Sequence, residues 1–143
     1  MPYRNLPDIA IADTAFEATG ETREALFAAA ADAVMSVMVD DLGTIGEGEV
    51  RNVRLTNDTL DLLLLDFLEE FIFFKDSEQL LLRPRHITIF DKEGPLVLEA
   101  VLSGERMDPE KHAFKVDVKA VTLHMFEITK TDEGWKATVV LDV

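Results

Sequence analysis

The side chains of this sequence that could do chemistry are its histidines and carboxylates, and their spacing limits what that chemistry could be. The histidines His86, His112 and His124 are scattered and do not have the spacing of zinc ligands. The chain has no cysteine, which excludes disulfides, thiolate metal sites and a cysteine nucleophile. It also lacks a phosphate loop, a dinucleotide-binding glycine pattern, a Gly-x-Ser-x-Gly elbow and a His-Glu-x-x-His motif. We therefore expect a protein that is not an enzyme, and the alternative is a hydrolase whose carboxylates are brought together by folding.

Residues 116–125 alternate like a half-buried strand, but polar residues occur on both of its faces. Lys119 and His124 are therefore expected to lie in a mostly covered surface, where a polar group without a partner is costly. Asp142 is also a polar residue in an apolar setting, because it follows the apolar residues 139–141 in the last strand, and it too would need a partner. The simplest interpretation is a salt bridge between Lys119 and Asp142 across adjacent strands.

Asp13 interrupts an alternating segment at residues 9–18, and on its own it is interpreted as a surface or bulge carboxylate. Aspartates in a chain without cysteine or paired histidines suit a hard cation such as magnesium, calcium or manganese. Two or three carboxylates held together would repel one another unless such a cation, or Lys119, compensated their charge. The residues by themselves leave both a salt bridge and a cation site open.

Two helices are expected, and both have N-terminal capping signals. Thr22 can cap a helix that runs to about residue 39, with Glu24 in its first turn. Residues 57–59 begin a second helix, which ends near residue 75 and is the most apolar element of the chain. It is too short and too often interrupted by acidic residues to cross a bilayer. Burial within the domain is expected, and docking of a partner or a second copy is the alternative.

Strands are expected before, between and after these helices. They lie at residues 3–6, 9–18, 49–55, 79–83, 85–90, 97–103, 114–130 and 135–143, with turn signals at 91–94 and 131–134. This pattern predicts an α+β fold with both helices packed on one face of a mixed, mostly antiparallel sheet. A chain of 143 residues without linkers is expected to be a single domain, 1–143.

The charge of the chain restricts its partners. Fourteen Lys and Arg residues against 28 Asp and Glu residues give a formal net charge of −14. An acidic surface repels phosphate backbones, so direct high-affinity binding of nucleic acid is not expected, and a basic protein partner suits the sign better. The alternative is that the acidity only keeps the protein soluble. The N-terminus has no signal-peptide apolar core, and neither a membrane partner nor export from the cytoplasm is expected.

A series of short motifs, taken in order, resembles the archease family. The motifs are Ala12-Asp13 with Gly20, SVMVD at 36–40, the leucine-rich residues 62–74, GERMDPEKH at 104–112, VKAVTLHM at 118–125 and the final LDV. The likeness runs nearly end to end, and its specificity comes from the order and spacing of the motifs. It implies the archease fold and a chaperone-like accessory protein of tRNA processing in the cytoplasm.

The resemblance also implies a function. Archease-like proteins act as cofactors of the RtcB-type RNA ligase, which joins tRNA exons using GTP and manganese. They speed formation of the ligase–guanylate intermediate and support multiple turnover without catalysing ligation. The alternative within the same family is a chaperone or modulator of a tRNA cytosine methyltransferase or of other protein clients.

The functional residues implied by the resemblance form a metal site built from aspartates, for calcium, magnesium or manganese. Matched motif by motif, Asp13 and Asp142 correspond to metal ligands, and Asp40 matches the aspartate after the first helix. The terminal carboxylate of Val143 could contribute to the same site, and Lys119 matches the lysine of the VKA motif.

The sequence departs from the family in one place. The usual His-Thr before the Ala-Asp pair is replaced by Ala10 and Ile11. This puts in doubt any role given to that histidine, but not the role of Asp13. His124 follows Leu123 where the family often has an aromatic residue, and we expect it to support the structure.

Overall fold

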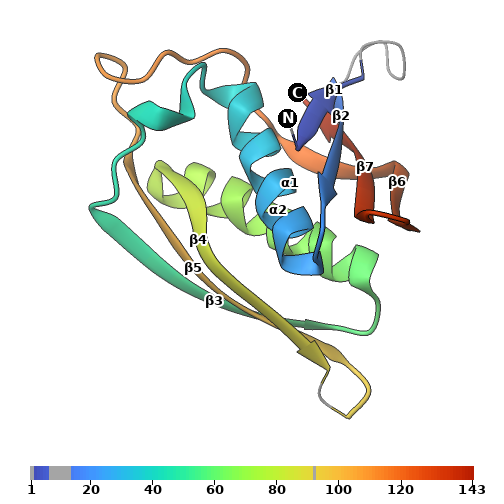
Figure 1. Cartoon of the computed structure of the whole chain (residues 1–143). Helices are drawn as coiled ribbons and strands as arrows, with labels where there is room; N and C mark the ends of the chain where they lie inside the picture. Colours follow the sequence, from blue (N-terminus) through green and yellow to red (C-terminus); the bar gives the residue numbers. More distant parts are fainter. Residues whose placement is uncertain (1, 7–13, 92) are drawn as a thin grey trace.

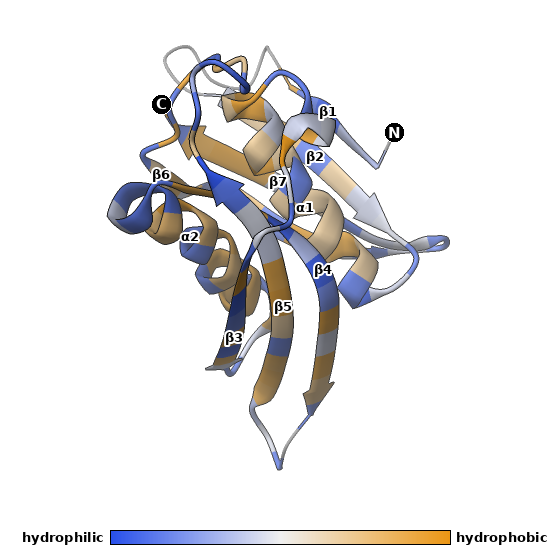
Figure 2. Ribbon diagram, turned by 90° about the vertical axis from the view of Figure 1, so that its left-hand side faces the viewer, coloured by the Kyte–Doolittle hydropathy of each residue, from blue (hydrophilic) through white to orange (hydrophobic). Residues whose placement is uncertain are grey.

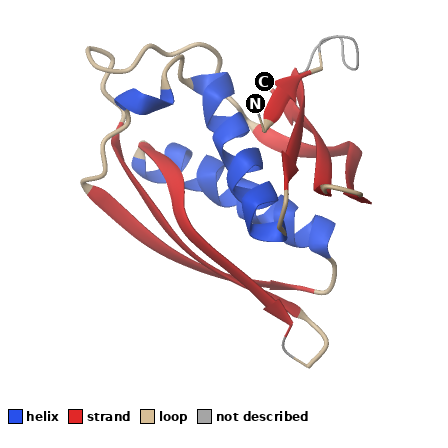
Figure 3. Cartoon of the chain, viewed as in Figure 1, coloured by secondary structure: helices blue, strands red, loops and turns tan. Residues whose placement is uncertain are grey.

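The structure is a computed structural model that describes residues 2–6, 14–91 and 93–143 (Figure 1). Its elements are β1 (Tyr3–Asn5), β2 (Thr14–Gly20), α1 (Arg23–Met38), the short 3-10 helix η1 (Leu42–Thr44), β3 (Glu49–Asn57), α2 (Leu60–Glu78), β4 (Leu80–Asp91), β5 (Leu96–Arg106), β6 (Ala120–Thr131) and β7 (Gly134–Asp142). Figure 3 shows the long helices lying between two groups of strands. The α+β class predicted from the sequence is confirmed.

The strands of the described residues form two antiparallel sheets, whereas the sequence predicted one mixed sheet. The first sheet has the order β1-β2-β7-β6, and the second has the order β3-β5-β4. In the first sheet Thr14 pairs with Leu141 and Gly20 pairs with Trp135. In the second sheet β5 pairs along its length with both β3 and β4. Two sheets can cover apolar helices from two sides, which a single sheet cannot do.

Helix α1 lies between the two sheets and contacts β2 and β7 on one side and β4 on the other. Thr22 caps it, since its hydroxyl accepts a hydrogen bond from the amide of Ala25 at 3.0 Å. Ten of its residues are buried, and four of these are alanines whose small side chains allow close approach of the sheets. Asp32 of α1 is paired, because Arg83 of β4 donates two hydrogen bonds of 3.1 Å to its carboxylate.

Helix α2 is longer than expected, because it continues to Glu78 and ends where Gln79 adopts the left-handed conformation at φ 57°. Its inner face is buried, and the ring of Phe67 lies 5.8 Å from that of Phe27 in α1. On its outer face Leu62 and Phe73 are 40% and 58% exposed. No helix of the described residues is long and apolar enough to cross a membrane.

Two strands differ from the sequence-based expectation. Pro84 does not divide β4, because the ladder with β5 continues across a register shift between Pro84 and His86. The strand expected at residues 114–130 starts only at Ala120. It also loses its regular pairing between Thr122 and Glu127, where Met125 has φ 56°.

Candidate functional site

The residues predicted to form a metal site come from segments that meet at one end of the molecule. The start of β2, the end of β7 and the C-terminal end of α1 all lie toward the top of Figure 1. This arrangement follows from the antiparallel pairing of β2 with β7 and from the packing of α1 along both strands.

Asp142 is the last residue of β7. Its side chain is exposed, although the preceding residues Val140 and Leu141 are buried. Its main chain is fixed, because its carbonyl oxygen accepts a hydrogen bond from the amide of Lys119 at 2.8 Å. Val143, which follows it, is half-buried and packs against the core.

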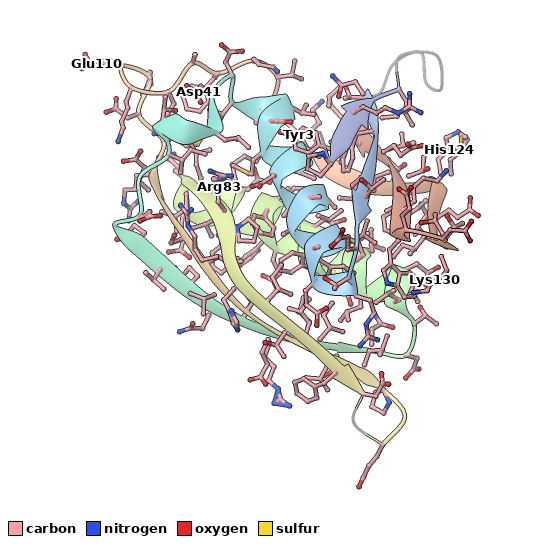
Figure 4. All side chains as sticks on the ribbon, viewed as in Figure 1. Tyr3, Asp41, Arg83, Glu110, His124 and Lys130 are labelled. Atoms are coloured by element: carbon pink, nitrogen blue, oxygen red, sulfur yellow. The ribbon has the colours of Figure 1, made fainter. Side chains whose placement is uncertain are left out.

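Lys119 does not form the salt bridge with Asp142 that the sequence suggested. Both side chains are exposed. The hydrogen bond that the structure shows between the two residues joins the amide of Lys119 to the carbonyl oxygen of Asp142. The expectation that Lys119 and His124 lie in a covered surface is therefore wrong. His124 projects outward from β6 in Figure 4, within the irregular part of that strand.

Asp40 lies just beyond the end of α1, with an exposed side chain. Its amide donates to the carbonyl of Ala113 at 2.9 Å, and Val39 forms an isolated antiparallel bridge with Phe114. These contacts tie the end of α1 to the segment that leads to Lys119. They do not bring Asp40 into contact with Asp142.

Asp13 lies outside the described residues. Its neighbour in the chain, Thr14, pairs with Leu141, which is the neighbour of Asp142. Within the described ranges, no group of three or more His, Asp or Glu side chains is placed to hold a metal ion. The predicted cation site therefore remains a prediction that depends on Asp13.

A buried lysine, Lys75 of α2, was missed by the sequence-based reasoning. Its ammonium donates to the carbonyl of Val118 at 2.8 Å and pairs with the carboxylates of Asp117 and Asp76. Burial lowers the pKa of Lys75, but the hydrogen bonds and charges of Asp117 and Asp76 raise it by more, so its pKa lies above the usual value. The signal was present in the sequence, because Lys75 continues the buried helical spacing of Phe71.

The side chain of Lys75 holds the 113–119 segment against α2, and a small hollow remains beside it. The hollow has a volume of about 120 Å³ and is lined by Met38, Lys75, Leu81, Met107, Phe114, Lys115, Val116 and Asp117. This anchoring explains why residues 116–119 follow the helices instead of extending β6.

The motif GERMDPEKH builds a second polar cluster around a buried histidine. Nδ1 of His112 accepts a hydrogen bond from the amide of Asp108 at 3.0 Å, so the proton is on Nε2, which donates to Glu105 at 2.8 Å. Lys111 and the amide of Gly46 also donate to the Glu105 carboxylate. Together these donors lower the pKa of Glu105 to about 2. The cluster fixes the loop after β5 to the loop before β3, which is a structural role.

The architecture defines the class of protein. Protein 1598 of Methanobacterium thermoautotrophicum, solved in solution, superimposes with a TM-score of 0.86 at 34% sequence identity, covering 99% of each chain. The crystal structure of an archease and possible chaperone from Thermotoga maritima superimposes with a TM-score of 0.66 over 98% of each chain. At 19% identity the second likeness shows the fold alone. The chain therefore has the archease fold.

The sequence comparisons define the family. Residues 3–143 match the Archease protein family (MTH1598/TM1083). Protein archease of Methanosarcina mazei is 39% identical over 133 residues, which covers 92% of this chain and 90% of that protein. Protein archease of Pyrococcus abyssi is 37% identical over 133 residues, covering 92% of this chain and 93% of that protein. The chain belongs to the archease family, as its motifs suggested.

Proposed function

We propose that this protein is a non-enzymatic, cytoplasmic activator of an RtcB-type RNA ligase and that it acts through a divalent cation bound by Asp13 and Asp142. The observation that carries the proposal is the register of β2 with β7, in which Thr14 pairs with Leu141. Asp13 and Asp142 adjoin these two paired residues in the chain. Membership of the archease family supports the same role.

The donor set fits a hard divalent cation. Asp142 offers an exposed carboxylate, and among the described residues it forms no salt bridge with a lysine, arginine or histidine. Carboxylate oxygens are the ligands that calcium, magnesium and manganese prefer. Asp40 and the carboxylate of Val143 are further candidate ligands at the same end of the molecule. A bound cation would supply positive charge to neutralise the phosphate oxygens of a nucleotide.

The residues around Asp142 hold it in position. The hydrogen bond between the Lys119 amide and the Asp142 carbonyl fixes the backbone on which the carboxylate is carried. The exposed ammonium of Lys119 adds a positive charge next to this strand end, in a chain whose net charge is −14. The negative net charge of the whole chain favours a basic protein partner over direct contact with RNA.

Calorimetric titration with calcium, magnesium and manganese tests the cation site. Wild-type protein is expected to bind at least one of these ions, and Asp13→Asn and Asp142→Asn are each expected to weaken binding at least tenfold. Asp132→Asn is the matched control, because Asp132 is an exposed acid in a different turn. Equal affinity in wild type and both site variants would contradict the proposal.

A chaperone of other proteins, including a tRNA cytosine methyltransferase, is the alternative function. It is favoured by exposed apolar side chains on β6, since Leu123 and Met125 are 66% and 49% exposed. The Thermotoga maritima protein is described as a possible chaperone. Suppression of the aggregation of an unrelated client, lost in Leu123→Ser with Met125→Ser, would support this alternative.

A further inference from the structure

We infer that the outer face of α2, together with the adjoining edge of β3, is a docking surface for a basic amphipathic segment of a protein partner. The surface, called here the α2 stripe, consists of Leu55, Leu62, Asp66, Glu69, Glu70 and Phe73. It belongs to elements other than the β2 and β7 strand ends, and the inference does not depend on the proposed cation site.

The α2 stripe has the shape of a docking surface. An open hollow of about 430 Å³ lies between α2 and β3, lined by Leu55, Asp66, Glu69, Glu70 and Phe73. Phe73 is 58% exposed at one end, and Leu62, which is 40% exposed, lies on the same side of the helix toward the other end. Figure 2 shows hydrophobic and hydrophilic residues alternating along α2 beside β3. Exposed apolar groups around a hollow are typical of interaction sites.

The charge of the α2 stripe indicates which partner it fits. Asp66, Glu69 and Glu70 lie within two turns of the helix, and none of them forms a salt bridge with a lysine or arginine of the described residues. Asp66 is held by a neutral group, the side-chain amide of Asn57, at 2.9 Å. Three carboxylates that lack a countercharge from the described part of the chain, lying between two apolar side chains, complement a segment with basic residues between apolar ones.

The raised pKa values of Glu69 and Glu70 are consistent with a site that receives a basic side chain. Burial raises the pKa of both, and the negative charge of Asp66 raises each pKa further, while a backbone contact with Val121 partly opposes the shift at Glu69. A lysine or arginine placed among them would relieve the repulsion.

Other occupants fit the α2 stripe less well. A second copy of this chain would bring the same three carboxylates and a net charge of −14 to the contact. Nucleic acid and anionic lipid surfaces would meet the same repulsion. From Leu62 to Phe73 the stripe runs about 16 Å along the helix axis, which about three turns of a partner helix would cover.

Binding of a defined probe tests the inference. The probe is a synthetic 14-residue peptide with leucine and lysine at helical spacing, and a leucine–glutamate peptide of the same pattern is its control. We expect fluorescence anisotropy to show binding of the basic peptide only. In Asp66→Asn with Glu69→Gln and Glu70→Gln, binding should weaken about tenfold or more.

A matched triple variant separates a local site from a general charge effect. Glu21→Gln with Asp132→Asn and Glu133→Gln removes the same charge from exposed acids around a different hollow. This variant should bind the probe almost as tightly as wild type. Equal weakening in both triple variants, or none in the α2 variant, would overturn the inference.

Amide shifts of the wild-type protein provide a readout that does not depend on variant folding. Titration with the basic peptide should move the signals of α2 and of residues near Leu55. Shifts confined to other elements would overturn the inference. A dimer in sedimentation that dissociates when Phe73→Ser is introduced would assign the α2 stripe to a second copy and would overturn it as well.

Discussion

The buried ammonium of Lys75 pairs with the carboxylate of Asp117, 42 residues further along the chain. The same ammonium donates to the main-chain carbonyl of Val118 at 2.8 Å. The pair fixes the segment after His112 against α2 just before the chain enters β6. It therefore positions the backbone that leads to Lys119, and through it the end of β7.

Replacement of Lys75 by methionine should lower stability and loosen this segment. Lys75→Met leaves the Val118 carbonyl without a donor, which should lower the free energy of unfolding by about 1 to 3 kcal/mol. Chemical denaturation measures that loss, and faster amide exchange at residues 116–119 should accompany it. Lys115→Met is the control, because Lys115 is exposed and its bond to the Ser36 carbonyl should contribute only about 0.5 kcal/mol or less. Unchanged stability and exchange in Lys75→Met would contradict this role.

The Glu105 cluster should make stability depend on acid pH. The pKa of Glu105 is lowered to about 2 from 4.5, so its ionised form is favoured by the fold. A lowered pKa contributes stability that is present above the unfolded value and is lost as pH falls through the folded value. Glu105→Gln should therefore be less stable than wild type at neutral pH, and the difference should shrink as pH falls from about 4.5 to 2. A difference that stays constant over this range would show that the charge of Glu105 is not involved.

Gly104 is required because two strands approach closely. A Cβ added there would overlap the carbonyl oxygen of Leu81 in β4. Gly104→Ala should lower the free energy of unfolding by about 3 kcal/mol, through strain in a packed sheet. Gly48→Ala is the matched control, because nothing lies within 4 Å of the added carbon, and its effect should stay within about 0.5 kcal/mol. Similar melting temperatures for the two variants would contradict this account.

Removal of Asp142 and Val143 should abolish activation of the ligase and leave the protein folded. The truncated chain loses the hydrogen bond from the Lys119 amide and the packing of Val143, a cost of about 1 to 2 kcal/mol. The circular dichroism spectrum should remain that of the folded protein, while activation of the ligase is lost. Full activation by the folded, truncated protein would show that the end of β7 is not the functional element.

Helix α1 shows how far the sequence predicts the fold. The capping residue Thr22 and the end near Met38 follow from local signals. Burial of α1 on two sides does not follow from them, because it depends on a second sheet formed by strands distant in the sequence. The feature of the sequence that corresponds to the second sheet is the set of four buried alanines in α1, because their small side chains allow the sheets to approach the helix closely.

The candidate site shows a different limit. Asp142 and Lys119 were singled out correctly as neighbours on adjacent segments, but the alternating pattern of residues 116–125 predicted the wrong contact between them. The pattern failed because Lys75 holds Asp117 and Val118 to α2, a tertiary contact that outweighs strand periodicity. The buried histidine proved to be His112 rather than His124, because its two ring nitrogens have partners within its own loop.

Guanylation of a purified RtcB-type ligase tests whether this protein activates the ligase through Asp13 and Asp142. The rate of formation of the ligase–guanylate intermediate is measured with GTP and manganese, with and without this protein, beside Asp13→Ala and Asp142→Ala. We expect faster guanylation with wild type and no acceleration with either folded variant, whereas Asp132→Ala should behave as wild type. If an RtcB-type ligase from the same organism is guanylated at the same rate with and without the protein, the proposed function is wrong.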